Sequence, residues 1–171
     1  MNIPANITAV TFFAHKILPL LSAHKPDIKF FIVGSRPARA VLALNDLPNI
    51  EVVGEVPSLL PYYAQASVVV VPLFTGGGII VKTLNGLASG RPVVTTSVGN
   101  SGTGAKHERD LLISSPTPEV FSAAILELLD NEQAWLHLAE NGRKFIQAHY
   151  DWSKTIDSMI NFLQEVSEQE P

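Results

Sequence analysis

The chain has 171 residues, of which 46% are hydrophobic and 16% are charged. This length and composition are typical of one compact globular domain, and they exclude both a disordered chain and a complete two-domain enzyme. The formal net charge is −4, and no run of lysine or arginine occurs that could follow a phosphate backbone, so we expect no nucleic-acid partner.

The absence of cysteine excludes disulfides and thiolate chemistry and fits a reducing compartment, so we expect a cytoplasmic protein. No apolar run approaches the ~18 residues that a membrane-spanning helix needs. The histidines show no metal-ligand spacing, so we expect no metal site.

Apolar residues at helical spacing predict a first helix from about Asn6 to Ser22, which Pro26 ends. Further helices are expected at Ala38 to Leu44, Ser58 to Gln65, Ile80 to Ser89, Pro118 to Leu129, Glu132 to His149 and Ser153 to Glu168. Short β-branched runs predict strands at Ile28 to Val33, Ile50 to Val53, Val68 to Val71, Pro92 to Thr95 and Leu111 to Ile113.

The strand expected at Val68 to Val71 consists of four valines and is apolar on both faces. Such a strand is typical of the middle of a parallel sheet that helices cover on both sides. Together with the alternation of strands and helices, this predicts an α/β fold with a doubly wound parallel sheet, in which ligands bind at the carboxyl ends of the strands.

A run of three glycines, Gly76, Gly77 and Gly78, follows the valine strand and precedes a predicted helix. Glycine lets the backbone approach a ligand closely, and free amides at a helix start favour an anion. Lys82 lies one turn further on and adds a positive charge, so the pattern predicts a diphosphate site. A tight connection without any ligand explains the same glycines equally well. The dinucleotide fingerprint is absent, because Val81 stands at its third glycine position.

In order and spacing, these segments resemble the C-terminal domain of GT-B glycosyltransferases of family 4, the glycosyl transferases group 1 type. The resemblance covers nearly the whole chain. Its landmarks are Asn2 to Val10, Ile32 to Ser35, Ile50 to Val56, Pro61 to Tyr63, Val71 to Leu73, the glycine loop with Lys82, Leu84 to Gly90, Arg91 to Thr96, Val98 to Gly99, Arg109 to Ile113 and Tyr150 to Trp152.

The resemblance implies retaining, metal-independent transfer of a sugar from a nucleotide-diphosphate donor, with no further cofactor. It implies that Lys82 acts as the catalytic residue at the diphosphate, with the loop of Gly76, Gly77, Gly78 and Ile79 around it. It also implies that Asn85 lies at the ribose and that Glu55 and Val56 lie near the base. Arg36 is a further candidate at this rim, although a solvated turn arginine explains it as well.

The match to the family departs at two positions where members commonly carry glutamate, here Gly77 and Asn85. An amide in place of the ribose-binding carboxylate lowers the expected donor affinity about tenfold. The family's first strand is apparently missing, and so is the N-terminal acceptor-binding domain, which would carry any peripheral membrane contact. We therefore expect one donor-binding domain over residues 1–171, inactive alone, whose C-terminal helix at about 151–168 packs toward the missing domain.

Two alternatives stay open. One is a degenerate, non-catalytic binder of nucleotide sugars that has lost its glutamates. The other is a flavodoxin-like regulatory or interaction module, although the expected acidic cluster at a strand end is missing. His107 is a further candidate for ligand contact, against the simpler interpretation of a solvated charged turn.

Overall fold

The computed structural model describes residues 1–151, and the helix predicted at Ser153 to Glu168 lies outside them. The helical segments are α1 (Pro4–Phe12), the π-helical turn η1 (Phe13–Ile17), α2 (Leu18–His24), α3 (Arg39–Leu42), the 3-10 turn η2 (Ala43–Asp46), α4 (Leu60–Gln65), α5 (Val81–Ala88), α6 (Pro118–Asp130) and α7 (Glu132–His149). The strands are β1 (Phe30–Val33), β2 (Ile50–Gly54), β3 (Val69–Val71), β4 (Val93–Thr95) and β5 (Leu112–Ile113). Every element predicted within the described residues is present, with bounds shifted by a few residues.

All strand pairs are parallel, as predicted, but they form two sheets rather than one. The first sheet pairs β1 with β2, and the second has the order β3-β4-β5. The prediction that the valine strand is central is therefore wrong, because β3 pairs with β4 along one edge only. Its other edge faces β1 across a groove that is described below.

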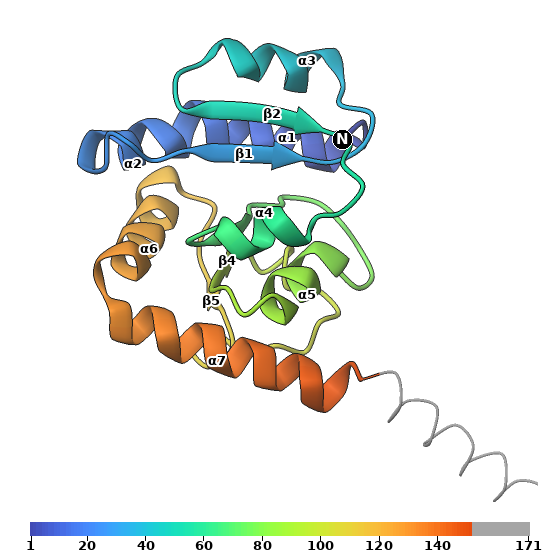
Figure 1. Cartoon of the computed structure of the whole chain (residues 1–171), viewed down its shortest axis with the longest axis vertical. Coiled ribbons are helices and arrows are strands. Elements are labelled where there is room, and N and C mark those ends of the chain that lie inside the picture. The colour runs from blue at the N-terminus through green and yellow to red at the C-terminus, as the bar shows by residue number, and fades with distance from the viewer. Residues whose placement is uncertain (152–171) are drawn as a thin grey trace, which may run out of the picture.

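The first helix runs from Pro4 to His24 through α1, η1 and α2. The wide turn η1 has a local cause: Pro19 brings no N–H and its ring crowds the preceding turn, and the amide of Leu18 bonds to the carbonyl of Phe13 instead. This long helix lies along the first sheet (Figure 1). Its side chains enter the core clusters of both sheets. Ala14 shares a cluster with Ile32 of the first sheet. Ala9 shares one with Val71 of the second sheet, and Phe13 shares one with Val94.

The second sheet has the denser packing. All three residues of β4 are buried, and α5 lies directly on the sheet through Gly86. A Cβ at Gly86 would approach Val93 Cγ2 to 2.7 Å, so only glycine permits this contact. Below, α7 packs on α5 through Gly142, beside Leu87, and crosses the base of the molecule (Figure 1).

Within residues 1–151, no helix combines the length and the apolar character that crossing a membrane requires.

Candidate functional site

The glycine loop, Gly76 to Gly78, connects β3 to α5 at the carboxyl edge of the second sheet. The helix begins at Val81, two residues after the loop. The glycines therefore do not form the helix start, contrary to the prediction that they open the helix. A Cβ added at Gly77 or Gly78 would meet nothing within 4 Å. Gly78 has a φ of +70°, a conformation that favours glycine. The surface above this loop is therefore open to a ligand.

The segment that follows β4 supports the glycine loop from one side. A Cβ at Gly102 would lie 2.9 Å from the carbonyl oxygen of Gly78 and 3.0 Å from the Cα of Ile79, so two backbones are in direct contact there. The amide of Ile80 donates to the carbonyl of Ser101 at 3.3 Å, and Thr83 Oγ1 donates to the carbonyl of Gly99 at 2.6 Å. These contacts fix the loop on rigid neighbours.

The sequence analysis did not predict that the segment after β4 supports the glycine loop. Two glycines in that segment, Gly99 and Gly102, were the signal in the sequence that could have indicated it. Glycines near the carboxyl end of a strand often mark a close approach of backbone. Which backbone they approach is a tertiary contact, and it follows only from the structure.

Lys82 lies in the first turn of α5, and its side chain extends to the start of α1. The Nζ of Lys82 donates a hydrogen bond to Asn6 Oδ1 at 3.0 Å. Partial desolvation lowers the pKa of Lys82 from the ordinary value of 10.5. First-turn amides of a helix have no partner within the helix, so those of Val81 and Lys82 add positive potential beside this ammonium group. Sequence reasoning did not identify Asn6.

Asn85 lies about one turn after Lys82, and its side chain hydrogen-bonds with the hydroxyl of Tyr63 on α4. Burial raises the pKa of Tyr63, and the hydrogen bond from Asn85 offsets part of that effect. Ile79, at the end of the glycine loop, is 54% exposed. The predicted residues Lys82, Asn85 and Ile79 thus line one common surface.

Three other predicted residues lie elsewhere on the carboxyl edge. Arg36 follows β1 in a turn with φ of 48° and is exposed, and Glu55 and Val56 follow β2. None of the three lines the groove with Lys82. Their contact with a base stays a prediction.

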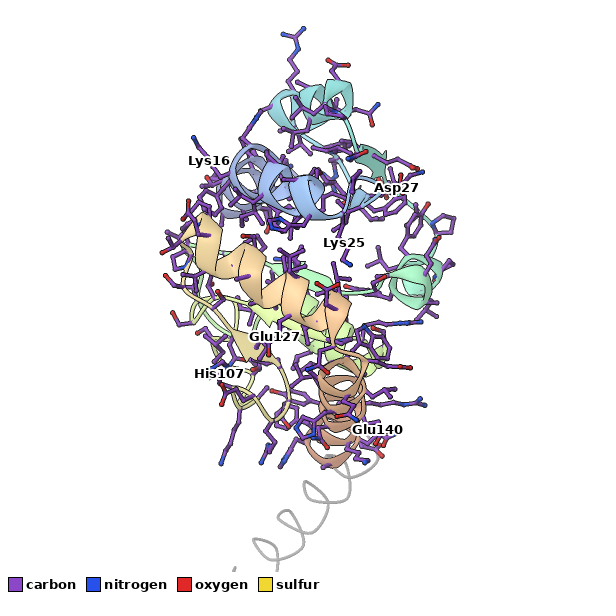
Figure 2. The ribbon with its side chains drawn as sticks, turned by 90° about the vertical axis from the view of Figure 1, so that its left-hand side faces the viewer. Lys16, Lys25, Asp27, His107, Glu127 and Glu140 are labelled. Atoms are coloured by element: carbon purple, nitrogen blue, oxygen red, sulfur yellow. The ribbon has the colours of Figure 1, made fainter. Side chains whose placement is uncertain are left out.

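His107 does not reach this surface. Its Nδ1 accepts a hydrogen bond from the amide of Ile113 at 3.0 Å. In Figure 2 it lies beside β5, on the opposite side of the molecule from α4. Its position therefore supports the solvated-turn interpretation. Among residues 1–151, no cluster of three or more histidine, aspartate or glutamate side chains could hold a metal ion.

Lys82 and Asn85 stand at one end of a groove of about 850 Å³ that separates the two sheets. Its walls are β1 and β3 with the residues that flank them. Its remaining surface comes from the first helix, α4 and the face of α6 that carries Ile125 and Leu129. The groove is lined mainly by apolar side chains, and its polar lining residues include Asn6, Lys82 and Asn85 as well as Asp27, Lys29 and Ser67.

Residues 1–131 match the family model of the glycosyl transferases group 1. The chain belongs to this family. A relative of 27% identity over 166 residues is an uncharacterized 44.6 kDa protein in the cps region of Klebsiella pneumoniae. The match covers 92% of this chain and 42% of that protein, so the chain spans less than half the length of this curated relative. Membership of the family contradicts the flavodoxin-like alternative.

Solved structures of other proteins show the same fold. The C-terminal domain of a glycosyl transferase group 1 protein from Francisella tularensis matches with a TM-score of 0.53 and 15% identity, over 78% of this chain and 92% of that one. Anabaena HepE, solved in complex with UDP, matches with a TM-score of 0.74 and 14% identity, over 88% of this chain and 44% of that one. The chain therefore has the fold of a C-terminal GT-B domain.

Proposed function

We propose that this chain is the donor-binding domain of a glycosyltransferase that moves a sugar from a nucleotide-diphosphate sugar to an acceptor. The observation that carries the proposal is the position of Lys82 in the first turn of α5, shortly after the open glycine loop, with its ammonium group bonded to Asn6 Oδ1 at 3.0 Å. Family membership and the fold shared with UDP-bound Anabaena HepE support it. UDP is therefore the first nucleotide to test.

The proposed chemistry follows from charge. When the bond between sugar and diphosphate opens, negative charge grows on the leaving diphosphate. Lys82 and the amides of Gly77 and Gly78 would then stabilise the transition state more than the ground state, which is how binding groups accelerate a reaction. We propose that this transfer needs no metal, because a side chain supplies the cation at the diphosphate. We also propose that it is retaining, as the family resemblance implies.

We propose further that the reaction needs a second domain. The chain spans 42% of its Klebsiella relative, and the residues that we assign above would all contact the donor. The acceptor and any group that orients it would come from an N-terminal domain facing the carboxyl edge.

Titration calorimetry with UDP, GDP and ADP tests donor binding. We expect one nucleoside diphosphate to bind, and Lys82→Ala to weaken it about 10- to 100-fold, since a charge-assisted hydrogen bond contributes ~1.5–3 kcal/mol. Lys144→Ala is the matched control: it removes the same charge from α7, where Lys144 pairs with Glu140 at 3.2 Å. No binding at millimolar nucleotide by a folded sample, or equal weakening by both substitutions, would contradict the proposal.

A non-catalytic binder of nucleotide sugars is the second candidate, and the environment of Asn85 favours it. The Asn85 side chain is already engaged by Tyr63, and an amide holds ribose hydroxyls less strongly than a carboxylate does. Asn85→Glu should raise donor affinity about tenfold if the ribose lies there. Transfer by a chain joined to an acceptor domain would then separate an enzyme from a binder.

A further inference from the structure

Asn6, in the first turn of α1, holds the Lys82 side chain from a different element. Its Oδ1 accepts a hydrogen bond from Lys82 Nζ at 3.0 Å, across 76 positions of the sequence. An ammonium group carries only donors, so the atom of the amide that faces it is the oxygen. The contact therefore has one fixed direction, in which Lys82 donates and Asn6 accepts.

The main chain of Asn6 is fixed by its own helix and by the core. The amide of Asn6 donates to the carbonyl of Ile3 at 2.9 Å in the first turn of α1. Its neighbours Ala5 and Ala9 pack in the core cluster that also contains Ile80, the residue directly before α5. Asn6 therefore reaches toward α5 from a backbone that is held in position.

The Lys82 side chain needs such an anchor because lysine is long and flexible. A free lysine is distributed over many rotamers, and binding an anion selects one of them at a cost in entropy. A hydrogen bond that already holds the ammonium group removes part of this cost before the anion arrives. Lys82 lies on an exposed part of α5, so its ammonium group depends on the bond to Asn6 for a fixed position.

The anchor is also neutral, unlike the carboxylate that commonly pairs with a lysine. A carboxylate at this place would compensate the ammonium charge, and a diphosphate would meet a neutral ion pair. Among the described residues that line the groove, the one carboxylate is Asp27, which precedes β1 at its amino end. Lys82 lies at the opposite, carboxyl edge. Its full positive charge is therefore available to an anion.

We propose that Asn6 is a positioning residue of the diphosphate site, whose neutral oxygen holds the Lys82 ammonium group in place and leaves its charge uncompensated. This role rests on the proposed donor-binding function, because a bound diphosphate is what makes use of the held charge. Asn6 acts through Lys82. Charge, more than size or shape, then decides which side chains position 6 tolerates.

Two substitutions at Asn6 separate charge from shape. Asn6→Asp keeps the shape of the side chain and replaces the amide by a carboxylate. We expect it to weaken UDP binding about 10- to 100-fold, as much as Lys82→Ala does, because the ion pair cancels the charge that attracts the diphosphate. Asn6→Ala removes the anchor but leaves the charge, so calorimetry should show a loss of only about three- to tenfold.

A double variant and a matched control show whether the effect passes through Lys82. In a Lys82→Ala background, Asn6→Ala should cause no further loss of affinity, since the group that it positions is gone. Asn141→Asp adds the same charge on α7, where Asn141 hydrogen-bonds with His137 at 3.2 Å, and should change UDP affinity by less than about twofold.

Three results of this calorimetry would overturn the proposal. A purely structural role for Asn6 would make the isosteric Asn6→Asp milder than Asn6→Ala. A direct role at the donor would give a further loss in the double variant. A general effect of net charge would make Asn141→Asp weaken binding as much as Asn6→Asp does.

An NMR titration of the lysine ammonium groups gives a readout that needs no nucleotide. A carboxylate beside an ammonium group favours its charged form, so Asn6→Asp should raise the pKa of Lys82 above its value in the wild type. An unchanged pKa would overturn the proposal, because Asn6 would not then contact the ammonium group. Failure of the proposed function gives a different result: the pKa of Lys82 rises in Asn6→Asp while the wild type binds no nucleotide.

Discussion

Valines on neighbouring strands of the second sheet have very different environments. On β4, Val93 and Val94 are fully buried, because β4 has a strand along each edge. On β3, Val69 and Val70 are only partly buried, because one edge faces the groove. The comparison shows that residue type alone does not determine burial in a sheet. At these positions the unpaired edge leaves Val69 and Val70 available, whereas Val71 on the same strand is buried by other neighbours.

Glycines show the same contrast between a packed region and an open one. A Cβ at Gly99 would lie 2.1 Å from Thr95 Oγ1 and 2.6 Å from the carbonyl oxygen of Val71, whereas a Cβ at Gly77 would meet nothing within 4 Å. The packed segment behind β4 thus carries a loop whose outer surface is free. This arrangement suits a site in which backbone amides must be both exposed and fixed in position.

The largest expected effect comes from testing this contrast directly. Gly99→Ala should lower the free energy of unfolding by about 3 kcal/mol, because the new methyl group overlaps a side chain and a backbone carbonyl. Gly77→Ala is the matched control and should change it by less than about 0.5 kcal/mol. Urea denaturation measures both. Similar values for the two variants would show that the packing behind β4 is looser than described.

The valine comparison predicts the next effect. Val93→Ala should cost about 2–3 kcal/mol of unfolding free energy, since it removes fully buried methyl groups from a close-packed site. Val70→Ala, the same change on the groove-facing strand, should cost less than about 1 kcal/mol. Chemical denaturation of both variants tests this order. If Val70→Ala costs as much, the groove side is already filled in the isolated chain.

A buried carboxylate provides a somewhat smaller test in the packed region. Burial alone raises the pKa of Asp110, but hydrogen bonds from Arg109 and the Lys106 amide outweigh it and hold that pKa below 3.8. Asp110→Asn should therefore lower the free energy of unfolding by about 1.5–3 kcal/mol at neutral pH.

The pH dependence of this effect has a fixed sign. Because the folded-state pKa of Asp110 is depressed, its stabilisation is complete above the ordinary value of 3.8 and is lost as the pH falls through the folded-state pKa. The difference between the wild type and Asp110→Asn should shrink over that acid range in denaturation experiments. A difference that stays constant with pH would assign the effect to packing instead.

The smallest predicted change concerns the open region around the glycine loop and Lys82, and it is the dependence of nucleotide affinity on pH. An anion needs the charged form of Lys82, whose pKa lies below 10.5. As the pH rises, affinity for UDP should therefore begin to fall at a lower pH than it would if Lys82 had the ordinary lysine pKa. The total loss of affinity should be up to about tenfold. Lys82→Arg should bind with a flat profile, since guanidinium stays charged. Calorimetry over the alkaline range measures this, and the same fall in Lys82→Arg would exclude Lys82 as its cause.

Much of the fold could be predicted from local patterns in the sequence. The helix predicted at Glu132 to His149 has those bounds in the structure, because its amphipathic spacing and the cap by Asn131, which accepts from the amide of Ala134 at 3.0 Å, are local features. The π-helical turn before Leu18 was not predicted. Pro19, which causes it, is present in the sequence, but the sequence does not show that packing against both sheets lets the helix continue past this proline.

The candidate site could be predicted only along one segment. The glycine loop and Lys82 are close in sequence, so pattern reasoning found them together. Asn6 is 76 positions from its partner Lys82, and no periodicity links them. The division into two sheets was missed for a similar reason, since the pattern of Val68 to Val71 reports how apolar the strand is and not which edges are paired.

A hydrogen bond from a tryptophan to the residue two positions before β3 allows the groove to be followed by fluorescence. The indole Nε1 of Trp135 donates to the carbonyl of Ser67 at 2.6 Å, and Ser67 lies on the groove wall. Arg91 stands over the same ring, 5.6 Å from its centroid. Indole emission responds to the polarity around it, so with Trp152 replaced by phenylalanine the protein carries its own spectroscopic reporter of whether that wall is wet or covered.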